Sequence, residues 1–456
     1  MSGSSLYLSV FLVGFLCFAV SMVQWRLSMY FFFAWLLVEG AFRKWFLPGL
    51  ATPLIFVKYA MIIGPFIRCL IKNKISYNFP FIPMIIVYAF WGLIEFSNWR
   101  ATSDIRIFLI GAMIHFSFIS LIIIIPRLLD TREKIWNFFR WGAILSIPIL
   151  LLGMYQYSLP QGHFLNKYVG DDSNIASVLG KARITSTFSY IGPFGQYLTI
   201  LFGFLMILIM QEKNKILSTV YYGCFLAAWL NTFMTASRGV VIISFIYVLG
   251  FIVLSRSREN ILWRKFVVRL FVAGMLTIAM FMFTQIGQDS SQRLLERFSR
   301  GNQKGEIAYR IYKMVRVAKL QNAGLVGYGI GTEFQGIKRI LDIRRKFGIS
   351  FEGEKDRLVA GIGLVGYIIV IIMRVVIFFW IWKVFLRIRD QSLRLILVFS
   401  VICLTQGFLL GGVIYNFLAS VQYWFSLGLA VSILQIESRE RLLYQKRRLN
   451  FCYDAR

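Results

Sequence analysis

The sequence has few of the side chains that bind metals or form disulfides. Its 456 residues include two histidines, His115 and His163, and five cysteines. The cysteines lie in predicted membrane spans or in the C-terminal tail, and they form no Cys-x-x-Cys pair or metal-type cluster. We therefore expect no disulfide framework, no metal ion and no cofactor. Because no second ligand lies near either histidine in the sequence, each is interpreted as a hydrogen-bonded packing or loop residue.

Acidic residues are also scarce, with 21 Asp and Glu against 50 Lys and Arg. Charged residues make up 16% of the chain, hydrophobic residues 58%, and the mean hydropathy is +0.68. A soluble protein of this size needs more polar surface, so the composition predicts an all-α polytopic membrane protein. We assign the excess positive charge to an anionic partner at the bilayer surface, and we expect no nucleic-acid partner.

Apolar runs of about 20 residues, enough to cross the hydrocarbon core of a bilayer, recur along the chain. They predict about 12–13 transmembrane helices and one long, partly helical extracytoplasmic loop. The predicted spans are 5–23, 27–42, 52–71, 80–98, 106–125, 138–158, 186–210, 216–235, 239–255, 266–286, 361–382, 393–411 and 414–434. The predicted regions are 1–286 (ten spans, with an outer loop at 159–184), 287–360 (the long basic loop), 361–434 (the last spans) and 435–456 (a basic tail).

Short basic loops indicate the orientation. Every second short loop is rich in Lys and Arg, as is the tail from Arg439 to Arg448, and this pattern is typical of cytoplasmic loops. The basic loops contain Lys72 and Lys74; Arg127, Arg132 and Lys134; Lys213 and Lys215; Arg256, Arg258, Arg264 and Lys265; and Lys383, Arg387 and Arg389. The C-terminus is then cytoplasmic and 287–360 lies outside, since the rule is weak for long loops.

The outer loop and the hairpin after it carry charged residues with two interpretations each. Asp171 and Asp172 resemble an acidic metal pair, but adjacent carboxylates in a Gly/Ser/Asn-rich loop are more often solvated. Arg183 follows shortly before the next span. At the hairpin Thr235-Ala236-Ser237-Arg238-Gly239, Arg238 either holds an anionic partner at the membrane mouth or extends to lipid headgroups.

The long loop contains a basic amphipathic stretch, followed by glycines. Between 309 and 320, Arg310 and Arg316 lie among the basic residues of a predicted helix whose other face is apolar. Such a helix anchors to acidic lipid or holds the diphosphate of a lipid-linked substrate, for which the planar guanidinium is well suited. The run from Gly324 to Thr332 lacks the context of a nucleotide-binding loop and predicts a tight turn.

Taken together, these segments resemble the O-antigen ligase/polymerase family of bacterial membrane glycosyltransferases, of the GT-C type. The matching pieces are Arg183-Ile184-Thr185-Ser186-Thr187-Phe188, the hairpin 235–239, Arg310, the glycine turn and Gly361–Gly366. The earlier Glu39-Gly40-Ala41-Phe42-Arg43-Lys44-Trp45 is similar to a motif of polysaccharide polymerases. The resemblance implies metal-independent transfer of a glycan from undecaprenyl diphosphate, or a related polyprenyl diphosphate, outside the bacterial cytoplasmic membrane. Arg238 and Arg310 match the diphosphate-binding arginines, with Arg183 and Arg316 as further substrate-binding residues.

The chain departs from the ligase branch of the family in one respect. Ligases place a histidine late in the long loop, whereas this chain has none between 287 and 360. The resemblance thus favours a polymerase of exopolysaccharide or O-antigen repeat units, with Glu354 or Glu352 as the base and Arg357, one helical turn after Glu354, holding it ionised. A chain-length regulator and a flippase of the same cell-envelope pathway are expected partners.

Two alternatives remain open at this stage. One is a ligase that transfers finished glycan to the lipid A core. The other is a transporter or flippase of the lipid-linked sugar, which the intramembrane charges Lys58 and Arg374 keep open. We interpret Arg374 as extending toward the cytoplasm.

Overall fold

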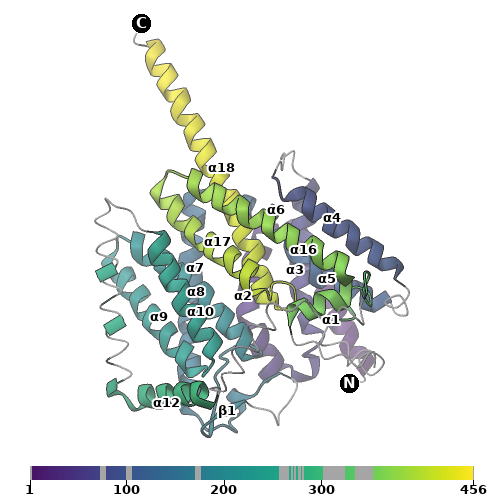
Figure 1. The fold of residues 1–456 in the computed structure, drawn as a ribbon, viewed down its shortest axis with the longest axis vertical. Helices are drawn as coiled ribbons and strands as arrows, with labels where there is room; N and C mark the ends of the chain where they lie inside the picture. The colour runs from purple at the N-terminus through teal and green to yellow at the C-terminus, as the bar shows by residue number, and fades with distance from the viewer. Residues whose placement is uncertain are drawn as a thin grey trace.

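The computed structural model describes residues 3–71, 79–98, 105–169, 176–255, 284–300, 324–333 and 353–454, with isolated helical positions between 267 and 283. It is an all-α bundle (Figure 1), which confirms the predicted fold class. Eight helices in this part of the chain are long and apolar enough to cross a membrane, so the protein is a multi-pass membrane protein. The shorter apolar helices are Gly14–Val23, Ile82–Ser97 and Arg238–Leu254.

The elements follow the predicted spans closely. The helices are α1 (Gly3–Val23), α2 (Trp25–Ala41), α3 (Leu54–Ile71), α4 (Ile82–Ile94), α5 (Ile105–Phe116), α6 (Leu121–Leu128), α7 (Arg132–Ser158), α8 (Ile191–Gln211), α9 (Lys215–Met234), α10 (Arg238–Leu254), α12 (Gln285–Arg300), α16 (Glu354–Arg387), α17 (Gln391–Leu410) and α18 (Phe417–Asp454). Short helical turns are η1 (Phe42–Phe46), η2 (Pro48–Leu50), η3 (Glu95–Ser97), η4 (Ser117–Ser120) and η5 (Phe164–Asn166). Strands β1 (Ser177–Val178) and β2 (Lys181–Ala182) form an antiparallel hairpin in the predicted outer loop.

Three predicted boundaries differ from the structure. Helix α12 begins at Gln285, before the predicted start of the long loop. Helix α16 begins at Glu354 rather than at 361. Helix α18 runs unbroken through the predicted boundary at 435 and projects from the bundle at its C-terminus (Figure 1). Most of the predicted span 266–286 lies outside the described residues.

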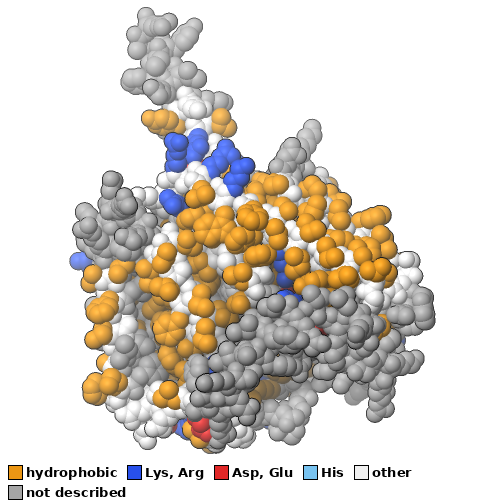
Figure 2. Space-filling model, viewed as in Figure 1, with side chains coloured by type: hydrophobic (Ala, Val, Ile, Leu, Met, Phe, Trp, Pro, Cys, Tyr) orange, Lys and Arg blue, Asp and Glu red, His pale blue; other side chains and the backbone are white. Residues whose placement is uncertain are grey.

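Aromatic rings pack the centre of the bundle. Phe138 of α7 stacks on Phe425 of α18 with ring centroids 5.4 Å apart, and Phe204 of α8 contacts Phe139 and Phe399. The outer face of the bundle is covered by apolar side chains between its two ends (Figure 2). This surface suits lipid rather than water, as expected for membrane-spanning helices.

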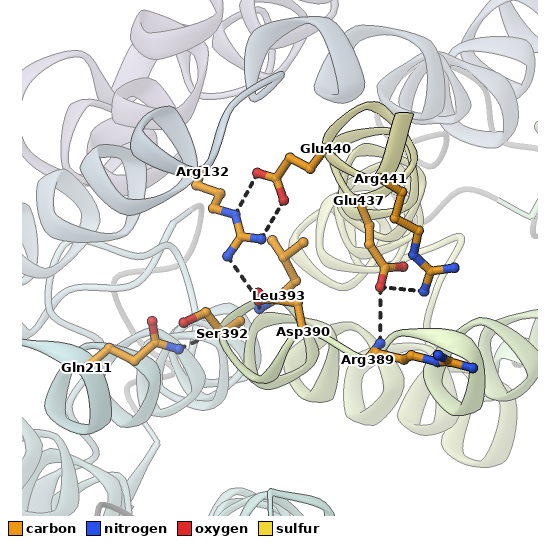
Figure 3. A network of polar contacts seen from close by, with 9 residues as sticks. All are labelled: Arg132, Gln211, Arg389, Asp390, Ser392, Leu393, Glu437, Glu440 and Arg441. Atoms are coloured by element: carbon orange, nitrogen blue, oxygen red, sulfur yellow. Dashed lines mark hydrogen bonds and ion pairs between the residues drawn. The ribbon is translucent and has the colours of Figure 1, made fainter. Parts of the chain in front are cut away.

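Ion pairs tie three helices together at the end from which α18 projects, here called the basic end (Figure 3). Arg132 at the start of α7 donates to Asp390 (2.9 Å) and to Glu440 (2.5–2.8 Å). Burial opposes the charge of Asp390, but hydrogen bonds from Arg132 and from the Leu393 amide outweigh it and hold the pKa of Asp390 below its ordinary value. The start of α7 and the turn before α17 therefore meet α18 at this end of the bundle.

Candidate functional site

Two sequence motifs about 140 residues apart pack together at the opposite end of the bundle, here called the motif end. Lys44 in η1 donates to Thr185 Oγ1 (3.0 Å) and to the Ser186 carbonyl (2.6 Å). Gly40 lies so close to the second motif that an added Cβ would be 2.4 Å from the Thr187 carbonyl oxygen. Only glycine permits this approach. The motifs at 39–45 and 183–188 thus form one unit.

A buried charge network lies beneath this contact. Glu39 accepts from Lys58 (3.0 Å) and from Arg43 (3.3 Å), and the Lys58 ammonium lies 3.7 Å from the centre of the Phe417 ring. Arg43 also donates to the Ala51 carbonyl (2.7 Å) and to Ser189 Oγ (3.1 Å). Glu39 thus faces the basic side chains of Arg43 and Lys58, so the network holds more basic than acidic groups. Burial lowers the pKa of the Lys44 ammonium to about 7.

Gln156, near the end of α7, supports the second motif and was missed from the sequence. Its carbonyl oxygen accepts from the Ser186 amide (2.7 Å), while its amide nitrogen donates to the carbonyls of Ser186 (3.2 Å) and Leu165 (2.8 Å). These bonds hold Ser186 at φ 47°, a conformation that a residue with a side chain rarely adopts. The sequence could have indicated Gln156, because an amide side chain within an apolar span usually has a hydrogen-bond partner.

Of the residues predicted to bind diphosphate, Arg183 contacts the turn that precedes Arg238 at the motif end. Arg183 Nε donates to the Thr235 carbonyl (2.9 Å), in the turn that leads directly to Arg238 at the start of α10. Both arginines are half-buried. Ala236, between Thr235 and Arg238 in the sequence, has φ 47°, so the α9–α10 turn is tight. Arg310 and Arg316 lie outside the described residues.

A cation pair frames Tyr157 beside this turn. Lys181 of β2 and Arg293 of α12 lie 5.3 and 4.9 Å from the Tyr157 ring centre. Lys181 also pairs with Asp289 at 3.8 Å. Helix α12 lies across the ends of α9 and α10 near the hairpin (Figure 1). Basic side chains from three elements therefore surround the motif end.

The predicted glycine turn is confirmed, and it is wedged between two helices. Gly324, Gly327, Gly329 and Gly331 all have positive φ. A Cβ on Gly331 would lie 2.1 Å from the Ile107 carbonyl of α5, and one on Gly327 would lie 2.5 Å from the Gly363 amide of α16. The amide of Tyr328 donates to the Ala360 carbonyl (2.7 Å). The glycines therefore serve close backbone packing.

Glu354 forms a buried ion pair with Arg374, which differs from both expectations for these residues. The two pair at 3.0 Å, although an unbroken helix would separate residues 20 positions apart by about 30 Å. Gly363, with φ 70° and ψ −178°, breaks α16 and lets its first turns fold back. Arg374 is thus 4% exposed, and the prediction that it extends toward the cytoplasm is wrong. The residue predicted to hold Glu354, Arg357, instead lies over the Tyr415 ring at 5.4 Å.

Hydrogen bonds occupy the acceptor positions of the Glu354 carboxylate. Besides two bonds from Arg374, it accepts from the amides of Gly412 (2.5 Å) and Ile414 (2.8 Å) in the α17–α18 turn. A carboxylate has about four acceptor positions, so this geometry favours a positioning role over the predicted base role. Glu352, the other predicted base, lies outside the described residues.

A second polar network, missed from the sequence, lies beside the glycine turn. His115 of α5 is buried between Tyr88 (2.5 Å to Nδ1) and Glu333 (2.9 Å to Nε2). Glu333 also accepts from the Gly331 amide (2.9 Å). His115 is therefore a hydrogen-bonded packing residue, and His163 a loop residue whose ring nitrogen accepts from the Leu165 amide, both as predicted.

Comparisons with known proteins add no assignment. No protein-family model matches the chain, and no curated protein matches it. Among the residues that the structure describes, no group of three His, Cys, Asp or Glu could hold a metal ion. The predicted acidic pair, Asp171 and Asp172, lies outside that part of the chain.

Proposed function

We propose that this protein polymerises polyprenyl-diphosphate-linked oligosaccharide repeat units on the outer side of a bacterial cytoplasmic membrane, with its C-terminus in the cytoplasm. The observation that carries the proposal is the hydrogen bond from Arg183 to Thr235. It joins two motifs of the O-antigen ligase/polymerase resemblance at the end of the bundle that faces outward in the predicted orientation. The motif at 39–45 packs against the same segment.

A half-buried guanidinium group bonded to the turn that carries a second one suits a diphosphate. In the proposed reaction, an acceptor hydroxyl attacks the sugar carbon that bears the polyprenyl diphosphate, and the diphosphate leaves with the bonding electrons. Arg183 and Arg238 donate charge-assisted hydrogen bonds to the departing oxygens, with Arg310 and Arg316 as further donors from the long loop. A carboxylate takes the acceptor proton. Since Glu354 is fully hydrogen-bonded, Glu352 is the proposed base, and Glu354 positions the α17–α18 turn.

The two alternatives gain no support from the described contacts. The intramembrane cations that kept a transporter open both have buried carboxylate partners, Glu39 for Lys58 and Glu354 for Arg374. The first pair links α3 to α2, and the second links the two parts of α16 across the break at Gly363. For the ligase alternative, the chain lacks the histidine that ligases place in the long loop. We propose a chain-length regulator and a flippase of the same pathway as functional partners.

Substitution of the two arginines tests the proposal. Arg183→Ala and Arg238→Ala should each reduce the amount of polymer about 10- to 100-fold while the protein level stays normal. Each removes a charge-assisted hydrogen bond worth about 1.5–3 kcal/mol. Arg238→Lys should rescue poorly, since lysine lacks the bidentate geometry. Arg441→Ala, at the basic end, is the matched control and should polymerise normally.

The lipid-linked intermediates in these variants separate the three functions. Single repeat units on the carrier, exposed on the outer leaflet, support a polymerase. Long polymer that is not attached to its acceptor indicates a ligase, and single units held on the inner leaflet indicate a flippase. Normal polymer from Arg238→Ala would contradict the proposed role of this residue.

A further inference from the structure

A partly open apolar cavity lies in the bundle, apart from the polar networks described above. Its walls come from α2, α7, α8, α17 and α18, and they include Phe33, Phe138, Trp141, Phe204, Phe399 and Phe425. The amide of Gln422, which also lines it, is bonded to Cys403 Sγ (3.0 Å). An apolar cavity of this kind disfavours water and accepts hydrocarbon.

The cavity opens to the side of the bundle, between α2 and the α7–α8 pair. Phe33 and Leu37 of α2, Trp141 of α7 and Ile200 of α8 line its rim and are half-buried, whereas Phe399 at its floor is fully buried. In a membrane protein this side faces lipid. A long apolar chain can therefore enter from the bilayer without crossing polar surface. We call this cavity the lateral groove.

The lateral groove leads toward the basic network at the motif end. The Leu37 carbonyl, at its rim, accepts a hydrogen bond from Thr187 Oγ1 (2.5 Å) in the 183–188 motif. Arg43 follows six residues later, which is about 9 Å along a helix. A chain that lies in the groove thus has its head beside the cluster that contains Arg43, Lys44 and Lys58. This arrangement fits an amphiphile with an anionic head and a long hydrocarbon tail.

We propose that the lateral groove binds the polyisoprenoid tail of the diphosphate-linked donor, an inference that rests on the proposed function. The trisubstituted double bonds of a polyisoprenoid restrict its rotation, so it loses less conformational entropy on binding than a saturated acyl chain of equal length. The rigid aromatic walls offer such a chain a fixed surface. Binding the tail there holds the diphosphate at the motif end during successive additions.

Photocrosslinking tests the groove without requiring sugar transfer. The probe is a polyprenyl diphosphate with a benzophenone near its tail, added to the full-length protein in phosphatidylglycerol-containing vesicles. We expect labelled peptides from α2, α7 or α8, and competition by unlabelled polyprenyl diphosphate. Ile200→Trp and Leu37→Trp, which fill the groove, should each lower labelling at least about 10-fold. Leu249→Trp, on the exposed face of α10, is the control and should label normally.

The outcomes separate the groove from the proposed reaction. Equal competition by excess phosphatidylglycerol, or labelling that both tryptophan variants leave unchanged, would overturn the inference and identify the groove as a site for ordinary lipid. Labelling of the groove in a protein that transfers no sugar supports the inference and contradicts the proposed function. If Ile200→Trp is poorly folded, Leu37→Trp provides the same test from the opposite wall.

Discussion

Neutralising Glu354 should act on stability as well as on transfer. In Glu354→Gln the Arg374 guanidinium stays buried but loses its counter-charge, and the amides of Gly412 and Ile414 lose a charged acceptor. Removing one partner of a buried ion pair costs about 3–5 kcal/mol, a change of roughly 100- to 4,000-fold in the unfolding equilibrium. A base that only accepts a proton would show no such loss.

A double-mutant cycle measures this coupling. Glu354→Gln, Arg374→Met and the double variant are unfolded reversibly in lipid–detergent mixtures, and transfer is assayed in the same preparations. We expect the double variant to be more stable than Glu354→Gln, because it no longer buries an unpaired charge. Glu440→Gln, which weakens a half-exposed pair with Arg132 at the basic end, is the control and should cost at most about 1 kcal/mol.

One result would refute the reasoning directly. If Glu354→Gln keeps the stability of the parent protein but cuts transfer about 100-fold or more, Glu354 is the general base and not a positioning residue.

Three further predictions concern the kink, the basic end and metal dependence. Gly363→Ala should lower stability by at least about 1–3 kcal/mol because of its backbone conformation, and it should prevent folding at physiological temperature in a thermal-unfolding assay. The control is Gly223→Ala, where a Cβ meets open space, and it should be neutral in the same assay. The lowered pKa of Asp390 contributes stability that is present above about pH 4 and is lost as pH falls through its folded pKa, so Asp390→Asn should flatten the acid limb of a stability titration. Transfer should persist in excess chelator; loss restored by Mg²⁺ would identify Asp171 and Asp172 as a metal site.

Hydropathy predicted the fold because it depends on local sequence. The spans 138–158 and 393–411 correspond to α7 and α17, and both helices begin after a residue that caps the first turn, Thr131 and Asp390. Each apolar run must form a helix in the bilayer, since its backbone groups have no other hydrogen-bond partners there. The glycine turn was equally local, because four closely spaced glycines favour positive φ.

The pairing of charges could not be predicted in this way. The apolar run around Gly363 predicts a continuous helix, and a continuous helix keeps Glu354 far from Arg374. The fold-back at Gly363 depends on the glycine turn at 324–331 packing against it, which is a long-range contact. The links from Lys44 to Thr185 and from His115 to Glu333 likewise join distant segments. Their signal was the presence of polar residues in apolar surroundings, which indicates a partner but does not name it.

Reconstitution of the purified protein is the most direct test of the proposed function. The protein is placed in liposomes with polyprenyl-diphosphate-linked repeat units, and the lipid-linked products are separated by length. A polymerase should produce a ladder of multiples of the repeat unit, and Arg238→Ala should abolish it. Repeat units that cross the bilayer without lengthening, or transfer only to an added lipid A core acceptor, would contradict the account.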